Sequence, residues 1–228
     1  MTTEILQFDA VTLPATDGYD EPVSGIDFVL RAGECALIEL EEERACPPFA
    51  DTAEGLSEPA SGRVLTEGRD WITLAPDEAV ARRSGIGRVF ERHAWVSNLD
   101  VDENVTLAQR HHTRRPPDEI RDEALRWAAR FGRDTLPAVR PVWASRRDLM
   151  IAQWVRALLG APRLIILEEP TRDMKKDDCD RLIQVVRERR AEGTAVMWLT
   201  SDMRLLNNES LDPGFRARVQ GASWETLE

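Results

Sequence analysis

The sequence has few cysteines and no long hydrophobic run. Its cysteines, Cys35, Cys46 and Cys179, are odd in number and widely spaced, which is typical of reduced thiols and not of a disulfide framework. The apolar runs 164–167 and 195–199 are far shorter than the roughly 20 residues of a transmembrane helix. The first residues lack the basic region and apolar stretch of a secretory signal. We therefore expect a cytoplasmic chain that reaches a membrane only through a partner.

Basic residues and histidines are also scarce. The chain has 30 Lys and Arg residues against 41 Asp and Glu residues, so its formal net charge is −11. This balance argues against nucleic acid and anionic lipid headgroups as ligands. His93, His111 and His112 do not combine with the cysteines at metal-ligand spacing, so we predict no structural metal. At 228 residues, one compact unit is the default expectation.

A loop after the buried-strand pattern 35–38 lacks the residues that hold phosphate. It reads Leu-Glu-Glu-Glu-Arg-Ala-Cys-Pro-Pro over residues 40–48, whereas a P-loop needs glycines, a lysine, and a Ser or Thr for magnesium. Each carboxylate within about 4 Å of a phosphate charge would cost roughly 1 kcal/mol in water and roughly 4 at a partly shielded surface. Pro47 and Pro48 remove two backbone donors, although a helix can start at prolines. Taken alone, the loop reads as an ordinary strand-to-helix turn.

The order of the expected elements indicates a mostly parallel sheet. The expected strands are 5–8, 25–30, 35–40, 63–65, 86–90, 164–167 and 195–200. The expected helices are 49–56, 118–131, 145–159 and 177–190. The last two strands and the helix between them form a crossover unit, and such units place their strands parallel.

Seven segments, in order along nearly the whole chain, match the motifs of one family. They are 31–34 (Arg-Ala-Gly-Glu), 55–64, 88–91 (Arg-Val-Phe-Glu), 102–105 (Asp-Glu-Asn-Val), 144–148 with 156–158, 164–171 (Leu-Ile-Ile-Leu-Glu-Glu-Pro-Thr) and 199–202 (Leu-Thr-Ser-Asp). Through them the chain resembles the nucleotide-binding subunit of ABC transporters. The resemblance implies a P-loop NTPase-like (RecA-like) α/β fold, in which a mostly parallel sheet core carries an antiparallel β part and a helical subdomain.

The resemblance also implies a nucleotide site, and the sequence departs from the family there. Counting back from segment 55–64 places Cys46 at the family's lysine, and Pro47 and Pro48 at its Ser/Thr pair. Glu91 stands at the glutamine of the Q-loop. Glu168 stands at the Walker B aspartate that helps to hold magnesium, with one more methylene group. We therefore expect these positions to bind neither metal nor nucleotide.

The signature and switch positions depart in the same way. Arg146 and Arg147 replace both signature glycines after Ser145, and their side chains would obstruct ATP held by an opposing subunit. Ser201 stands where the family has its switch histidine. Glu169 keeps the position of the catalytic glutamate, yet without bound nucleotide it has no water to activate. We expect no catalytic residue and no cofactor, with ATP and Mg only if the site is rescued or a partner ATPase supplies them.

Segment 90–101 resembles the ATPases of MCE-type lipid transporters more narrowly. In that family this surface accepts the coupling helix of the membrane subunit. Trp95 and Val96 would then be apolar contacts, and Glu91 and Arg92 polar ones. Packing of Trp95 within its own domain is weighed equally with that role.

The main hypothesis is a single ABC ATPase-like domain, 1–228, without ATPase function. Its α/β core would span 1–90 and 155–228, and its helical subdomain 91–154. It would assemble with a transporter membrane subunit on the inner face of the membrane, and pair with a competent ATP-binding subunit or with itself. It would play a structural, coupling or regulatory role without using ATP. Two alternatives stay open: a weakly active ATPase that powers transport, rescued by Arg44, Arg146 or Arg147, and a free-standing binding protein on the same scaffold.

Overall fold

A computed structural model of the chain describes residues 3–15, 21–41, 46–92, 94–206, 208 and 210–227. Its strands are β1 (Glu4–Leu13), β2 (Val23–Arg31), β3 (Cys35–Leu40), β4 (Ser61–Thr66), β5 (Arg69–Asp70), β6 (Ile86–Val89), β7 (Leu164–Glu168), β8 (Ala195–Thr200), β9 (Phe215–Gln220) and β10 (Ser223–Leu227). Its α-helices are α1 (Pro47–Ala53), α2 (Pro76–Arg83), α3 (Val101–His112), α4 (Pro117–Arg130), α5 (Arg146–Leu158) and α6 (Lys176–Ala191). Short 3₁₀ helices occupy Trp71–Thr73, Pro141–Trp143 and Met203–Leu205.

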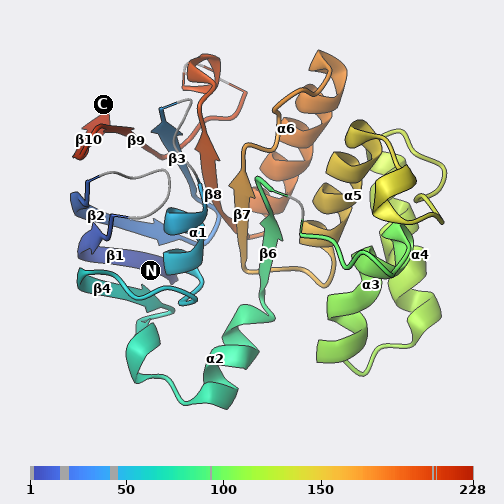
Figure 1. The fold of residues 1–228 in the computed structure, drawn as a ribbon, viewed down its shortest axis with the longest axis horizontal. Helices are drawn as coiled ribbons and strands as arrows, with labels where there is room; N and C mark the ends of the chain where they lie inside the picture. The colour runs from blue at the N-terminus through green and yellow to red at the C-terminus, as the bar shows by residue number, and fades with distance from the viewer. Residues whose placement is uncertain are drawn as a thin grey trace.

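The described strands form one sheet in the order β5-β4-β1-β2-β10-β9-β3-β8-β7-β6 (Figure 1). From β9 to β6 the neighbouring strands are parallel, whereas β2, β1, β4 and β5 pair antiparallel. A parallel contact between β10 and β2 joins the two parts. The predicted α/β fold, with a parallel core and an antiparallel β part, is confirmed.

Both faces of the parallel strands are buried, which explains their nearly continuous apolar sequences. Along β8, Val196 and Trp198 join the core on the side of α3–α6, while Met197 and Leu199 join the core under α1. β3 and β7 alternate in the same way. Because successive side chains of a strand point to opposite faces, one apolar run supplies two cores.

Helices α3, α4 and α5 pack against one another and gather beyond β6 (Figure 1). The Oγ of Ser145 caps α5 by accepting the N–H of Asp148 at 3.1 Å. α5 is held close to β6 because Gly87 has no side chain, and a Cβ there would lie 1.9 Å from the carbonyl oxygen of Ala157. The division into a core and a helical subdomain at 91–154 stays a prediction.

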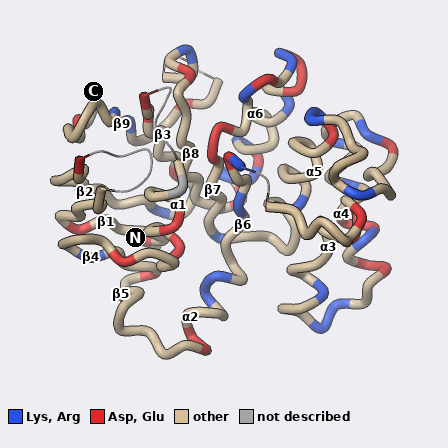
Figure 2. The backbone as a smooth tube through the Cα atoms, viewed as in Figure 1, with Lys and Arg blue, Asp and Glu red and all other residues tan. Residues whose placement is uncertain are grey.

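Acidic and basic positions are interspersed along α4 and α6 (Figure 2). Among the described residues, no helix combines the length and the apolarity needed to cross a membrane.

Candidate nucleotide site

The carboxyl ends of β6, β7 and β8 meet the start of α1. Parallel strands end at one edge of a sheet, where α/β proteins place their ligand crevices. Cys46 precedes α1, Glu91 follows β6, Glu169 follows β7 and Ser201 follows β8. The structure therefore brings together four positions that the family resemblance assigned to the nucleotide site.

Cys46 is fully buried at the start of α1. Its backbone N–H donates to Oε2 of Glu91 at 3.1 Å. Burial, reinforced by the carboxylates of Glu91 and Glu169, raises the pKa of its thiol. The next two residues are prolines, and the N–H groups of Phe49 and Ala50 both donate back to the Cys46 carbonyl at 3.1 and 3.3 Å. The backbone donors at this helix start are therefore used within the chain.

The remaining loop residues, 42–45, lie outside the described residues. The expected repulsion by Glu42 and Glu43, and the expected rescue by Arg44, have no structural outcome. Pro47 begins α1, as the prolines of the sequence permit.

Arg172 bridges the carboxylates of Glu91 and Glu169. Its Nη1 lies 3.1 Å from Oε1 of Glu91, and its Nη2 lies 3.1 Å from Oε1 of Glu169. The Arg172 side chain is 41% exposed, whereas those of Glu91 and Glu169 are 8% and 5% exposed. The guanidinium thus neutralises part of the buried negative charge while one side of it still faces solvent.

Glu169 is held by the end of the neighbouring strand β8. Its Oε1 accepts the N–H of Ser201 at 2.6 Å, and its Oε2 accepts the hydroxyl of Thr200 at 3.4 Å. Its backbone is left-handed, with φ at +43°, a conformation that costs a non-glycine residue about 1 kcal/mol or more. The fold therefore fixes this carboxylate with both side-chain and backbone constraints.

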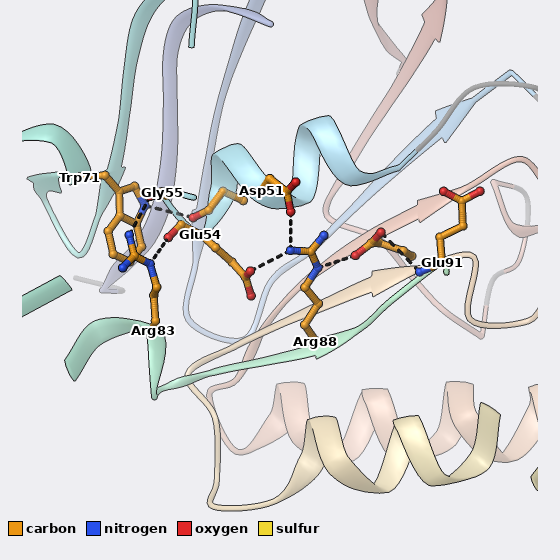
Figure 3. A network of polar contacts seen from close by, with 9 residues as sticks. Asp51, Glu54, Gly55, Trp71, Arg83, Arg88 and Glu91 are labelled. Atoms are coloured by element: carbon orange, nitrogen blue, oxygen red, sulfur yellow. Dashed lines mark hydrogen bonds and ion pairs between the residues drawn. The ribbon is translucent and has the colours of Figure 1, made fainter. Parts of the chain in front are cut away.

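Arg88 forms a buried network beneath the site (Figure 3). Its Nε donates to Oε1 of Glu168, and its Nη1 contacts Asp51 at 2.7 Å and Glu54 at 2.8 Å. The other oxygen of Glu168, Oε2, accepts the N–H of Glu91 at 3.4 Å. The side chains of Arg88 and Glu168 are 4% and 0% exposed. The carboxylate at the Walker B position is thus fully engaged inside the protein.

The charges of this network depend on one another. Burial raises the pKa of the Glu168 carboxyl group, although the Arg88 guanidinium opposes the rise. Burial likewise raises the pKa of Glu54 against the effect of Arg88. For Arg88 itself, burial works against the charged form, but Glu168 and Glu54 outweigh it and raise the pKa of the guanidinium. Arg88 therefore carries a permanent positive charge.

The signature positions are occupied by internal contacts. Arg147 binds the buried Asp178 through two hydrogen bonds of 2.7 Å, and these hold the pKa of the Asp178 carboxyl below its usual range. The hydroxyl of Ser145 contacts Asp148 at 2.6 Å. Arg146 lines a cavity of about 170 Å³ together with Glu91, Glu169 and Arg172 among others. Arg146 therefore faces the same space as the candidate catalytic carboxylate.

The predicted docking residues lie beside this site, following β6. Trp95 packs against the core of the helical part, and the Arg156 guanidinium carbon lies 4.7 Å from the centre of its ring. Burial lowers the pKa of Arg156 to about 10. Val96 is 43% exposed, and Arg92 is exposed. Trp95 thus packs in its own domain, while contact of these residues with a membrane subunit stays a prediction.

Sequence reasoning missed four charged residues of the site: Asp51, Glu54, Arg88 and Arg172. Arg88 carried a detectable signal because it interrupts a buried-strand pattern, and a buried arginine requires carboxylate partners. Asp51 and Glu54 carried a weaker signal, three residues apart on the expected helix. Arg172 carried none, because its carboxylate partners lie together only in the folded chain. Within the described residues, no group of three or more His, Cys, Asp or Glu is arranged to hold a metal ion.

The chain is similar to known proteins along most of its length, although no protein-family model matches it. A putative ribose/galactose/methyl galactoside import ATP-binding protein of Rhizobium meliloti is 29% identical over 215 residues, covering 91% of this chain and 40% of the relative. The lipoprotein-releasing system ATP-binding protein LolD of Idiomarina loihiensis is 24% identical over 229 residues, covering 97% and 100%. A solved dimeric bacterial ABC transporter cassette has a TM-score of 0.83 at 19% identity, covering 98% of this chain and 99% of that chain.

The chain has the fold of ABC transporter cassettes and is similar in sequence to ATP-binding subunits of transporters. This cassette spans 40% of the length of the Rhizobium meliloti relative. The hypothesis of a subunit without ATP use was wrong, because the relatives are named as ATP-binding proteins and one cassette of this fold was solved with ADP and Pi. The comparisons favour the alternative of an active cassette. They also favour the conditional expectation of ATP and Mg over the expectation of no cofactor.

Proposed function

We propose that this cassette is the ATP-binding subunit of an ABC transporter and that it hydrolyses ATP slowly to power transport. The similarity to ATP-binding proteins over 91% and 97% of the chain carries the proposal. The cassette would pair with a second cassette and with a membrane subunit, on the inner face of the membrane. The dimeric solved cassette of the same fold supports the pairing.

Glu169 is the residue best placed to activate a water molecule. Its Oε1 is bound by the Ser201 N–H and by Arg172, whereas Oε2 has, among the described residues, only a 3.4 Å contact from the Thr200 hydroxyl. Oε2 is therefore the atom that could accept a proton from the attacking water. The fixed backbone of Glu169 keeps this oxygen in place.

Arg172 and Arg146 are the described cations that could face the phosphates of ATP. Both line the cavity that also contains Glu169. Cys46 supplies no charge in place of the family's lysine, and Glu91 adds a carboxylate to the same space. The predicted turnover is therefore low. Magnesium does not fit at Glu168, since the buried Arg88 guanidinium already pairs with this carboxylate and would repel a second cation. No step of the proposed reaction uses a metal at that residue.

The cargo is a second part of the proposal. Residues 90–101 resemble the ATPases of MCE-type lipid transporters, and one relative is named for releasing lipoproteins, at 24% identity over its whole length. Both support a lipid or lipid-modified cargo, whereas the Rhizobium meliloti relative, at 29% identity, is named for sugar import and supports a sugar cargo instead.

The test compares wild type with Glu169→Gln in the complex purified from native membranes. ATP binding is measured by calorimetry and turnover by phosphate release. A general base contributes about 10²- to 10⁴-fold, so turnover should fall at least about 100-fold in this variant. Glu188→Gln is the matched control, because Glu188 is an exposed partner of Arg130 on α6 and should leave turnover unchanged. Absence of ATP binding, or equal turnover in wild type and Glu169→Gln, would refute the proposal.

A further inference from the structure

We propose that Arg88 replaces the divalent cation at Glu168 in this cassette, so that ATP binding here does not depend on a metal ion. This inference rests on the proposed function for its nucleotide part. Its structural part concerns only the chain's own residues: a guanidinium from β6, a carboxylate from β7, the Asp51 carboxylate from α1, and the carboxylate of Glu54, which caps the end of α1.

Arg88 has the carboxylate partners that a bound cation would need at this place. Its guanidinium meets the carboxylates of Glu168, Asp51 and Glu54, and the last two share the nitrogen Nη1 at 2.7 and 2.8 Å. These three partners come from β7, from α1 and from the C-cap of α1, so the guanidinium links the helix to the strand. Arg88 therefore supplies both the positive charge and the cross-link.

The contacts also oppose a second cation. A metal ion needs free oxygens at short distance, and Oε1 of Glu168 is paired with Arg88 while Oε2 has a longer contact of 3.4 Å from the Glu91 N–H. An ion placed beside Glu168 would also be repelled by the guanidinium, since both are positive in a poorly solvated space. The ring of Phe90 lies under Arg88, with its centre 4.5 Å from the guanidinium carbon. The side chain is thus packed on its face as well as bound at its edge.

A purely structural ion pair would share these contacts, so the test must separate the two roles. Loss of a structural pair lowers stability and leaves metal binding absent. Loss of a cation substitute leaves Asp51, Glu54 and Glu168 uncompensated. These carboxylates are not arranged as a metal site in wild type, and in the variant they should move together to bind a divalent ion. The gain of metal binding is the property that distinguishes the roles.

The experiment measures Mn²⁺ binding by electron paramagnetic resonance and the Kd of a fluorescent ATP analogue with Mg²⁺ or with EDTA. In wild type we expect no tightly bound Mn²⁺ without nucleotide, and Kd values that agree within about threefold. In Arg88→Met we expect one bound Mn²⁺, thermal stabilisation by Mn²⁺, and Kd at least about tenfold lower with Mg²⁺ than with EDTA, equivalent to about 1.4 kcal/mol. Arg88→Lys keeps a cation and should behave as wild type.

Arg83→Met is the matched control. Arg83 is also partly buried next to the network, but it donates to the carbonyl oxygens of Glu54 and Gly55 and not to a carboxylate (Figure 3). It should gain no Mn²⁺ binding. A folded Arg88→Met protein that binds no Mn²⁺ would overturn the inference. So would wild type whose ATP binding is tightened tenfold by Mg²⁺, a result that stands even if Arg88→Met does not fold. If wild type binds no nucleotide at all, the proposed function fails, while the Mn²⁺ measurements still decide the role of Arg88.

Discussion

Replacing Gly87 by alanine should loosen the contact between the sheet and the helical part. The added Cβ would lie 1.9 Å from the Ala157 carbonyl oxygen and 2.8 Å from its carbonyl carbon. Both are backbone atoms of α5, so no side chain can rotate away, and the helix or β6 must move by more than 1 Å. Forced overpacking costs about 1–3 kcal/mol, and a backbone obstacle places this change at the upper end, about 3 kcal/mol. For a chain of this size the melting temperature should fall by about 6–12 °C.

The measurement is urea unfolding followed by tryptophan fluorescence, together with a thermal melt. Gly85→Ala is the matched control, because a Cβ there meets only the Arg82 carbonyl oxygen at 3.4 Å. It should change the free energy of unfolding by less than about 0.5 kcal/mol. If Gly87→Ala behaves like Gly85→Ala, the close packing of α5 on β6 is wrong. If Gly87→Ala is still folded but no longer binds ATP, the packing of α5 on β6 also determines the geometry of the nucleotide site.

Two further predictions concern titratable groups. Burial raises the pKa of the Cys35 thiol to about 12 and also raises the pKa of the Cys46 thiol. Of the three cysteines, only the half-buried Cys179 should therefore react with iodoacetamide in the native protein, as measured by mass spectrometry. Rapid labelling of Cys46 in the native protein would refute its burial. Burial also raises the pKa of Glu54 above its unfolded value of 4.5, so the folded state binds more protons between the two pKa values. Wild type should therefore gain stability relative to Glu54→Gln as the pH falls from neutral towards 4.5. The measurement is urea unfolding at several pH values. A difference in unfolding free energy that does not change with pH would contradict this prediction.

The sequence predicted the parallel core well because its strands carry an unambiguous signal. Runs such as 164–167 and 195–200 are apolar at successive positions, which a buried strand of an α/β sheet requires. The helices expected at 145–159 and 177–190 also match α5 and α6 within two residues. The C-terminal strands β9 and β10 were not predicted, since the charged residues of β9 hide its alternation: Arg216 and Arg218 alternate there with the buried Ala217 and Val219.

The site could be predicted by position but not by contact. Motif spacing placed Cys46, Glu91, Glu169 and Ser201 in one crevice, because each follows or precedes a predicted strand or helix. It could not show that the Cys46 N–H donates to Glu91, because the two residues are 45 positions apart and the contact depends on the side-chain rotamer of Glu91 in the folded chain. The functional hypothesis failed because it treated each changed residue as a loss of function, whereas the relatives that match most of this chain are named as ATP-binding proteins.

Strand β6 is only four residues long, yet it contacts several other elements. It lies last in the strand order and bonds only with β7 among the described strands. The short stretch 87–91 nevertheless contacts α5 through Gly87, α1 through Arg88 and the start of α1 through Glu91. A small displacement of the helical part would therefore shift β6 and Glu91, and with them the contact between Glu91 and the Cys46 N–H, so the packing of α5 and the geometry of the crevice are coupled.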